Sequence, residues 1–124
     1  MDLIPLRPGG RQVIERYGPT GFHVAGVFYA GPTLVFPDRT LGWTATSAAA
    51  ITWESLRPVV EDGHVEILLI GLGRRATAIS ASLRGELRRA GIAAEPMATG
   101  AACRTYNVLL AEDRRVGAAL IPPL

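Results

Sequence analysis

The sequence predicts a domain of the α/β class with some α+β character, because its hydrophobic pattern changes once along 124 residues. Residues 11–43 consist of short β-type runs separated by breakers such as Gly18-Pro19 and Gly31-Pro32. The second half alternates apolar strand-length runs with amphipathic stretches of helical length. With 48% apolar residues, the chain can bury one core but not two, so residues 1–124 are expected to form a single domain.

The runs of the first half have the length and composition of short strands. They are RQVIERY at 11–17, GFHVAG at 21–26, TLVFP at 33–37 and RTLGWT at 39–44. Their β-branched and aromatic residues favour strands, and the glycine and proline pairs between them favour tight turns. The segment 53–62 then predicts a short helix, which tolerates Pro58 only near a turn or at the first helical position.

The second half predicts strands and helices in alternation. The run VEILLIG at 65–71 is almost uniformly apolar, so we expect a strand covered on both faces at the centre of the sheet. A helix is predicted for 76–90, with Gly91 as its C-terminal glycine. The remaining elements are a strand at 92–96, a helix at 99–112 capped by Thr99, and a final strand at 116–122.

Charge and cysteine content argue against several classes of function. The net charge is only +2, and all thirteen basic residues are arginine, which is weak support for a nucleic-acid partner. Cys103 is the single cysteine, so the chain cannot form an internal disulfide. With only His23 and His64 beside it, a Cys/His metal site cannot be assembled either. No metal and no cofactor are therefore expected.

The N-terminal residues predict a protein that stays in the bacterial cytoplasm. Asp2 stands where a signal peptide has basic residues, and Pro5 and Pro8 interrupt the apolar stretch. The longest apolar run, 65–72, is far shorter than the roughly 20 residues of a membrane helix. Contact with the inner membrane is expected only at its periphery, through a partner.

A glycine turn follows the apolar strand at 65–71. Its sequence, Gly71-Leu72-Gly73-Arg74-Arg75-Ala76, matches the permissive dinucleotide pattern GxGxx(G/A), and Glu95 in the next strand could bind a ribose. The β-rich half before this turn does not fit a dinucleotide fold, so a plain strand-to-helix turn is the main interpretation. Binding of an anion without a dinucleotide remains open.

The predicted helix at 99–112 carries the densest group of polar residues. Cys103 and Tyr106 project toward the core, whereas Arg104 and Asn107 project elsewhere. A buried, inert Cys103 is favoured over a nucleophile, because no histidine lies near it in sequence. Thr105 and Asn107 are mediocre helix formers, so they suggest specific hydrogen bonds, either inside the protein or on the rim of a cleft or a partner surface.

A second arginine face lies on the predicted helix at 76–90. Arg84, Arg88 and Arg89 project away from its apolar side. This face could meet an acidic partner or a membrane surface, although an ordinary solvated face is the favoured interpretation.

Four segments resemble the small domain family that includes the mitochondrial respiratory complex I assembly factor three. They are GFHVAGVFYAGPTLVFP, Gly42-Trp43, VEILLIGLG and the region GIAAEPMATGAACRTYNVLLAEDRRVGAALI, which is strongest from Gly91 to Glu112. The resemblance implies a three-layer β/β/α arrangement around a mixed central sheet. It also implies a non-enzymatic assembly or scaffold protein, with respiratory complex subunits or another assembly factor as protein partners. A homodimer remains compatible with the chain.

The residues and the resemblance together indicate one candidate recognition surface and no catalytic residue. Its members surround the glycine turn and the helix at 99–112: Gly71, Gly73, Arg74, Thr99, Arg104, Thr105, Tyr106 and Asn107. Many relatives have an acidic residue before this threonine, whereas this chain has Ala98, so acid–base chemistry there would lack its carboxylate. The alternative is a small-molecule or anion-binding protein, or an enzyme, that uses the Gly71–Gly73 turn and Arg104.

Overall fold

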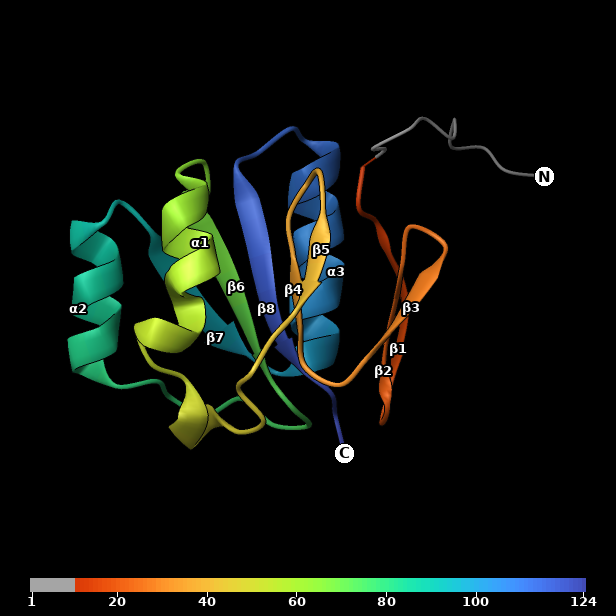
Figure 1. Ribbon diagram of the computed structural model, residues 1–124, viewed down its shortest axis with the longest axis horizontal. Coiled ribbons are helices and arrows are strands. Elements are labelled where there is room, and N and C mark those ends of the chain that lie inside the picture. The colour runs from red at the N-terminus through yellow and green to blue at the C-terminus, as the bar shows by residue number, and fades with distance from the viewer. Residues whose placement is uncertain (1–10) are drawn as a thin grey trace.

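The computed structural model describes residues 11–124, so the N-terminal segment on which the expectation about export rests lies outside the described residues. The strands are β1 (Ile14–Gly18), β2 (Gly21–Val24), β3 (Val27–Ala30), β4 (Thr33–Val35), β5 (Thr40–Gly42), β6 (Ile67–Leu72), β7 (Ala93–Met97) and β8 (Val116–Ile121). The α-helices are α1 (Arg57–Asp62), α2 (Ala81–Arg89) and α3 (Thr99–Ala111), and short 3₁₀ turns cover Ala48–Ala50 and Glu54–Leu56. The predicted α/β fold is confirmed (Figure 1).

The larger sheet is mixed and has the strand order β5-β4-β8-β6-β7. Strands β8, β6 and β7 are parallel to one another, whereas β4 is antiparallel to both β8 and β5. The apolar strand β6 lies inside the sheet as expected, but the central place belongs to β8, whose residues are all buried. The mixed central sheet is thus confirmed, with its last strand in sequence at its centre.

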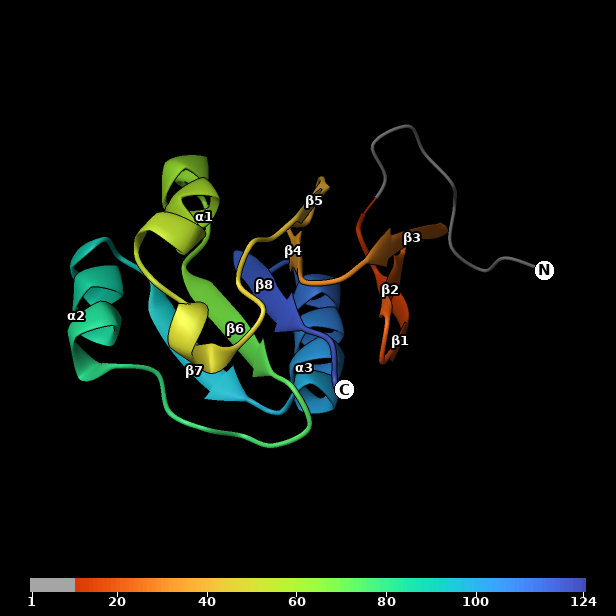
Figure 2. The ribbon, with the colours of Figure 1, turned by 60° about the horizontal axis from the view of Figure 1, so that its bottom comes forward.

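The smaller sheet has the order β1-β2-β3 and is antiparallel (Figure 2). Strand β3 had not been predicted as a separate element. Ala25 and Gly26 form a two-residue hairpin between β2 and β3, with φ angles of 50° and 82°. Positive φ at both turn residues is typical of a type I′ turn, but Ala-Gly is a weaker signal for it than Asn-Gly.

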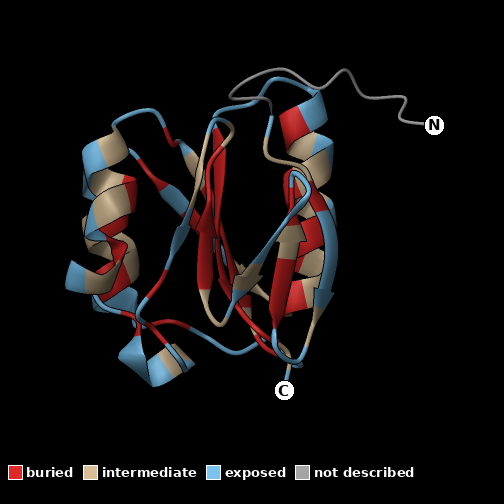
Figure 3. Ribbon diagram, turned by 45° about the vertical axis from the view of Figure 1, so that its right-hand side comes forward, coloured by how far each residue is buried: buried red, intermediate tan, exposed pale blue. Residues whose placement is uncertain are grey.

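Two apolar cores, and not the single core predicted from the chain length, lie on opposite faces of the five-stranded sheet. Helices α1 and α2 cover one face, and α3 covers the other, where the three-stranded sheet also packs (Figure 1). Residues such as Leu68, Leu83 and Leu87 fill the first core. Tyr106, Phe22 and Val116 fill the second. Buried residues accordingly follow the central strands and the inward faces of the helices (Figure 3).

Two helix starts differ from the prediction. Helix α2 begins at Ala81 and not at Ala76, because the Ser80 hydroxyl caps it by accepting a hydrogen bond from the Leu83 N–H at 3.0 Å. Thr99 does not cap α3: Ala98 occupies the N-cap position, and Thr99 is the first helical residue. Pro58 lies in the first turn of α1, as expected.

Candidate functional site

The Thr99 side chain joins the ends of three elements. Its side chain is fully buried, and its hydroxyl accepts a hydrogen bond from the Gly73 N–H at 2.8 Å while donating one to the Ile121 carbonyl at 2.6 Å. The Thr99 N–H donates to the Gly73 carbonyl at 2.8 Å. Thr99 therefore ties the start of α3 to the ends of β6 and β8, and its polar groups are used inside the protein.

Close packing explains Gly71, and backbone conformation explains Gly73. A Cβ atom on Gly71 would lie 3.0 Å from the Thr99 Cα and 3.1 Å from the Leu120 Cδ2, so a larger residue would push α3 away. Gly73 has φ +92°, which side-chain-bearing residues rarely adopt. Because its N–H is donated to Thr99 and α2 begins only at Ala81, the turn lacks the helix N-terminus of a dinucleotide site. Arg74 next to it is exposed.

Asn107 fastens β1 to α3. Its Nδ2 donates to the Ile14 carbonyl at 2.8 Å, and the Ile14 N–H donates to its Oδ1 at 3.0 Å. The register of β1 against β2 shifts between Ile14 and Arg16, at the point where this side chain takes up the backbone groups of Ile14. The prediction that Asn107 makes specific hydrogen bonds is confirmed, and these bonds lie inside the protein.

The inward side of α3 contains two groups that could have been reactive. Cys103 is buried, and burial raises the pKa of its thiol to about 12, so the thiolate needed for a nucleophile is disfavoured. Tyr106 is fully buried, and its hydroxyl has no hydrogen-bond partner among the described residues. Burial raises the pKa of this phenol above its usual value. Both side chains serve as core residues, and Thr105 beside them is half-buried.

Arg104 is the exposed residue among the candidates on α3. Its Nη1 donates a long hydrogen bond of 3.4 Å to the Tyr17 hydroxyl. Gly100, one turn earlier in α3, makes this approach possible, because a Cβ atom there would lie 2.5 Å from the Tyr17 hydroxyl oxygen. Arg104 and Tyr17 thus meet across the space between α3 and β1.

A shallow groove of about 380 Å³ follows this contact; we refer to it as the β1/α3 groove. Its lining residues are Ile14, Glu15, Arg16, Tyr17, Cys103, Arg104 and Asn107. The sequence analysis did not identify Arg16 and Tyr17. An exposed aromatic residue in a short strand was the available signal, but nothing in the sequence showed that β1 lies beside α3.

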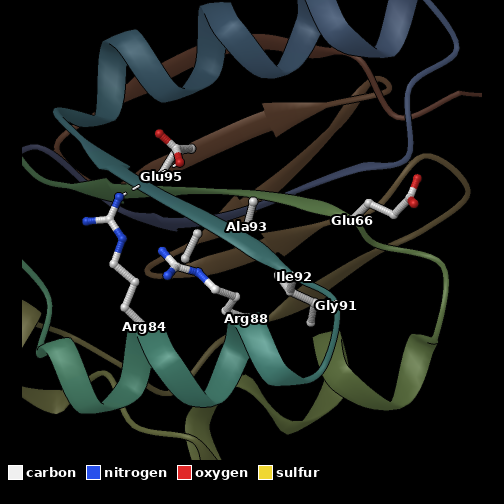
Figure 4. Close-up of a pocket in the computed structure, with 8 residues that line it drawn as sticks. Glu66, Arg84, Arg88, Gly91, Ile92, Ala93 and Glu95 are labelled. Atoms are coloured by element: carbon white, nitrogen blue, oxygen red, sulfur yellow. Dashed lines mark ion pairs between the residues drawn. The ribbon is translucent and has the colours of Figure 1, made fainter.

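The arginine face of α2 lies over the edge strand β7. Arg84 and Arg88 extend from the helix toward β7, where Arg84 pairs with Glu95 at 3.8 Å (Figure 4). Glu95, which could have bound a ribose, is therefore paired with an arginine of the same chain. Arg89 is exposed.

Residues 11–124 contain neither a metal-binding cluster nor a membrane-spanning helix. No group of three or more histidine, cysteine, aspartate or glutamate side chains in this range is placed to hold a metal ion. No helix within the same range has both the length and the apolar character needed to cross a membrane.

The matches to known proteins define the class to which this mixed α/β fold belongs. A family model described as "Protein of unknown function (DUF498/DUF598)" matches residues 14–121. A solved structure described as an outer membrane protein from Bartonella henselae superimposes with a TM-score of 0.84 at 38% identity, over 94% of this chain and 98% of that one. The chain belongs to this family, and its fold is that of the family.

Among the curated relatives are an uncharacterized bacterial protein and an animal protein named as a complex I assembly factor. An uncharacterized protein of Rhodobacter capsulatus is 40% identical over 97% of this chain and 94% of its own length. The zebrafish NADH dehydrogenase [ubiquinone] 1 alpha subcomplex assembly factor 3 is 39% identical over 90% of this chain. The match spans 64% of that longer protein. The family resemblance inferred from the sequence is confirmed.

Proposed function

We propose that this protein is a non-enzymatic assembly or scaffold protein that assists the biogenesis of respiratory complex I by binding protein partners. The observation that carries this proposal is the open β1/α3 groove, where Arg104 and Tyr17 are accessible while the neighbouring Thr99 and Asn107 are used in internal hydrogen bonds. Arginine and tyrosine are enriched among the residues that dominate protein–protein binding energy. The name of the zebrafish relative supports the same role.

The chemistry of α3 favours binding over catalysis. The Cys103 thiol is held protonated by burial, and the side chain at position 98, before Thr99, is an alanine without acid–base capacity. Recognition would then use the outward part of the predicted surface, with Arg104 as a polar contact and Thr99, Tyr106 and Asn107 as its structural support. The partners we propose are respiratory complex subunits or another assembly factor, met in the cytoplasm or at the periphery of the inner membrane.

Affinity purification from the native organism tests this function. Three baits are compared: the unmodified protein, Arg104→Ala, and Arg88→Ala as a control at an exposed arginine of α2. We expect complex I subunits or an assembly factor with the unmodified protein and with the control, and roughly tenfold less with Arg104→Ala. Equal thermal unfolding of the three baits shows that the loss is not a folding defect. Recovery of no respiratory protein by any bait would contradict the proposal.

The alternative function is the binding of a small anion or metabolite, or an enzyme acting on one, at the Gly71–Gly73 turn with Arg104. The exposed Arg74 favours it, whereas the use of the Gly73 N–H by Thr99 counts against it. Thermal unfolding with nucleotides and phosphorylated metabolites separates the two functions, because a ligand that binds only the folded state raises its apparent stability. A saturable rise in melting temperature would favour the alternative.

A further inference from the structure

We propose that the β1/α3 groove and the adjoining outer face of the three-stranded sheet bind an acidic, partly apolar segment of a partner protein. Arg16 and Arg104 would contact its carboxylates, and Tyr17 and Phe28 would contact its apolar side chains. The inference rests on the proposed function, since it assigns the partner chemistry of a surface that docks proteins.

The charges of the β1/α3 groove are unbalanced. Arg16 and Arg104 both line it, and neither has a carboxylate within 4.0 Å among residues 11–124. The acidic residue of the groove, Glu15, uses its Oε1 to accept a hydrogen bond from the Gly26 N–H at 2.8 Å. A carboxylate from outside would therefore find two guanidinium groups that the described part of the chain leaves without an ionic partner. Charge-assisted hydrogen bonds of this kind are stronger than neutral ones.

Two other grooves show the opposite arrangement. In the groove between α2 and β7, Arg84 pairs with Glu95 at 3.8 Å (Figure 4). In a groove lined partly by the first residue of β8, Arg11 pairs with Asp113 at 2.5 Å. Arg84 and Arg11 thus each have a carboxylate of their own chain beside them, although Arg88 and Arg114 in the same two grooves have none within 4.0 Å among residues 11–124. The β1/α3 groove differs from both in that neither of its arginines is paired.

Apolar anchors lie next to the unbalanced arginines. Tyr17 and Phe28 are large side chains that are 43% and 46% exposed. A second groove, on the three-stranded sheet, is lined by Arg16, Tyr17, His23 and Phe28 among others, so it shares two residues with the β1/α3 groove. The strand register places Arg16, His23 and Phe28 in one cross-strand row. The two grooves thus adjoin at Arg16 and Tyr17, along the edge strand β1.

This composition fits one kind of occupant. Aromatic residues and arginine are enriched at interface centres, and burial of their apolar area supplies binding energy. The unpaired arginines add orientation and selectivity, because a segment with lysine or arginine at the same place would meet like charges. An acidic segment with aliphatic or aromatic side chains satisfies both requirements.

Selection of random linear peptides displayed on phage tests the partner chemistry directly. The same library is selected on the folded protein, on the double variant Arg16→Glu/Arg104→Glu, and on the matched double variant Arg88→Glu/Arg89→Glu. We expect the first and third proteins to enrich peptides that combine aspartate or glutamate with apolar residues. These peptides should bind the Arg16→Glu/Arg104→Glu variant at least roughly tenfold more weakly. A further variant, Phe28→Ser, should weaken the same peptides while leaving their preference for acidic residues unchanged.

Three outcomes would overturn the inference. They are a selected pool without acidic enrichment, no pool above background, or an acidic pool that binds the Arg16→Glu/Arg104→Glu variant as well as the unmodified protein. Unchanged thermal unfolding of that variant excludes misfolding as a cause of lost binding. Recovery of complex I subunits together with a neutral or basic pool would refute the acidic partner and leave the assembly role standing. An acidic pool without any recovered respiratory protein would support the acidic partner segment and contradict the assembly role.

Discussion

The two faces of α3 use polar side chains for different purposes. At the side that meets the rest of the protein, Thr99 and Asn107 each make hydrogen bonds to backbone groups of distant strands. At the outward side, Arg104 donates a long hydrogen bond to Tyr17. The comparison teaches that an unusual polar residue in a helix indicates a specific bond, while its surroundings decide whether that bond serves the fold or a partner.

Replacement of Thr99 by valine should give the largest effect on the inward side. The change removes one donor and one acceptor and leaves the buried Gly73 N–H and the Ile121 carbonyl without this partner. We expect the free energy of unfolding to fall by about 2–4 kcal/mol, measured by urea denaturation. Thr105→Val, at a half-buried threonine of the same helix, serves as control and should cost less than about 1 kcal/mol. Equal losses of unfolding free energy in the two variants would contradict the special structural role of Thr99.

Asn107→Leu should have the next largest effect. The substitution leaves the Ile14 N–H and carbonyl without their side-chain partner, so β1 loses part of its attachment to α3. We expect a loss of about 1–3 kcal/mol and faster hydrogen exchange at the Ile14 amide. Val108→Leu, at an exposed position of the same helix, is the control and should leave this exchange rate unchanged. Retained protection of Ile14 in Asn107→Leu would show that other contacts hold β1.

Alkaline pH should destabilise the protein through Cys103. The pKa of its thiol is raised to about 12 in the folded state, so above the ordinary value of 9.0 the unfolded chain ionises first. The stabilising contribution is present below pH 9.0 and is lost as the pH rises toward about 12. We expect a loss of about 1 kcal/mol at pH 10, measured by urea denaturation across this range. In Cys103→Ala the curve of stability against pH should be flatter, and equal slopes would contradict the assignment.

Tyr106→Phe should give the smallest effect of the four. The phenol hydroxyl has no partner among the described residues, so its removal breaks no hydrogen bond there and relieves the burial of an unpaired polar group. We expect the free energy of unfolding to change by less than about 1 kcal/mol, toward higher stability if at all. Thermal unfolding measures it, with Tyr106→Leu as the control that removes ring packing. A loss comparable to that of Thr99→Val would mean that an ordered water bonds the hydroxyl.

Hydrophobic periodicity predicted the elements that have an uninterrupted apolar pattern. The buried strand β6, the helix α3 and the final strand β8 follow directly from their apolar patterns, and Leu83 and Leu87 are buried as their projection predicts. The predicted start of α2 was wrong because alanine and threonine at 76–78 are compatible with several conformations, whereas the Ser80 cap determines where the helix begins. The local hydrophobic pattern does not determine at which residue the helix begins.

The candidate site was predictable only on the helix. Projection of α3 correctly placed Arg104 away from the Cys103 and Tyr106 side, and Arg104 is exposed. The opposite wall could not be predicted, because Arg16 and Tyr17 reach α3 only after the three-stranded sheet packs against it. The bond between Asn107 and Ile14 joins residues 93 positions apart, and no periodicity reports a contact at that separation.

The place of β8 in the sheet determines the order in which the sheet can be completed. This strand follows all the other described strands in sequence, yet it separates the antiparallel pair β4–β5 from the parallel pair β6–β7. During translation, each of these pairs must therefore wait with an open edge until Val116 to Ile121 has left the ribosome and can be inserted between them. Unpaired edges of this kind attract other chains, so the nascent protein is exposed to aggregation until β8 is inserted.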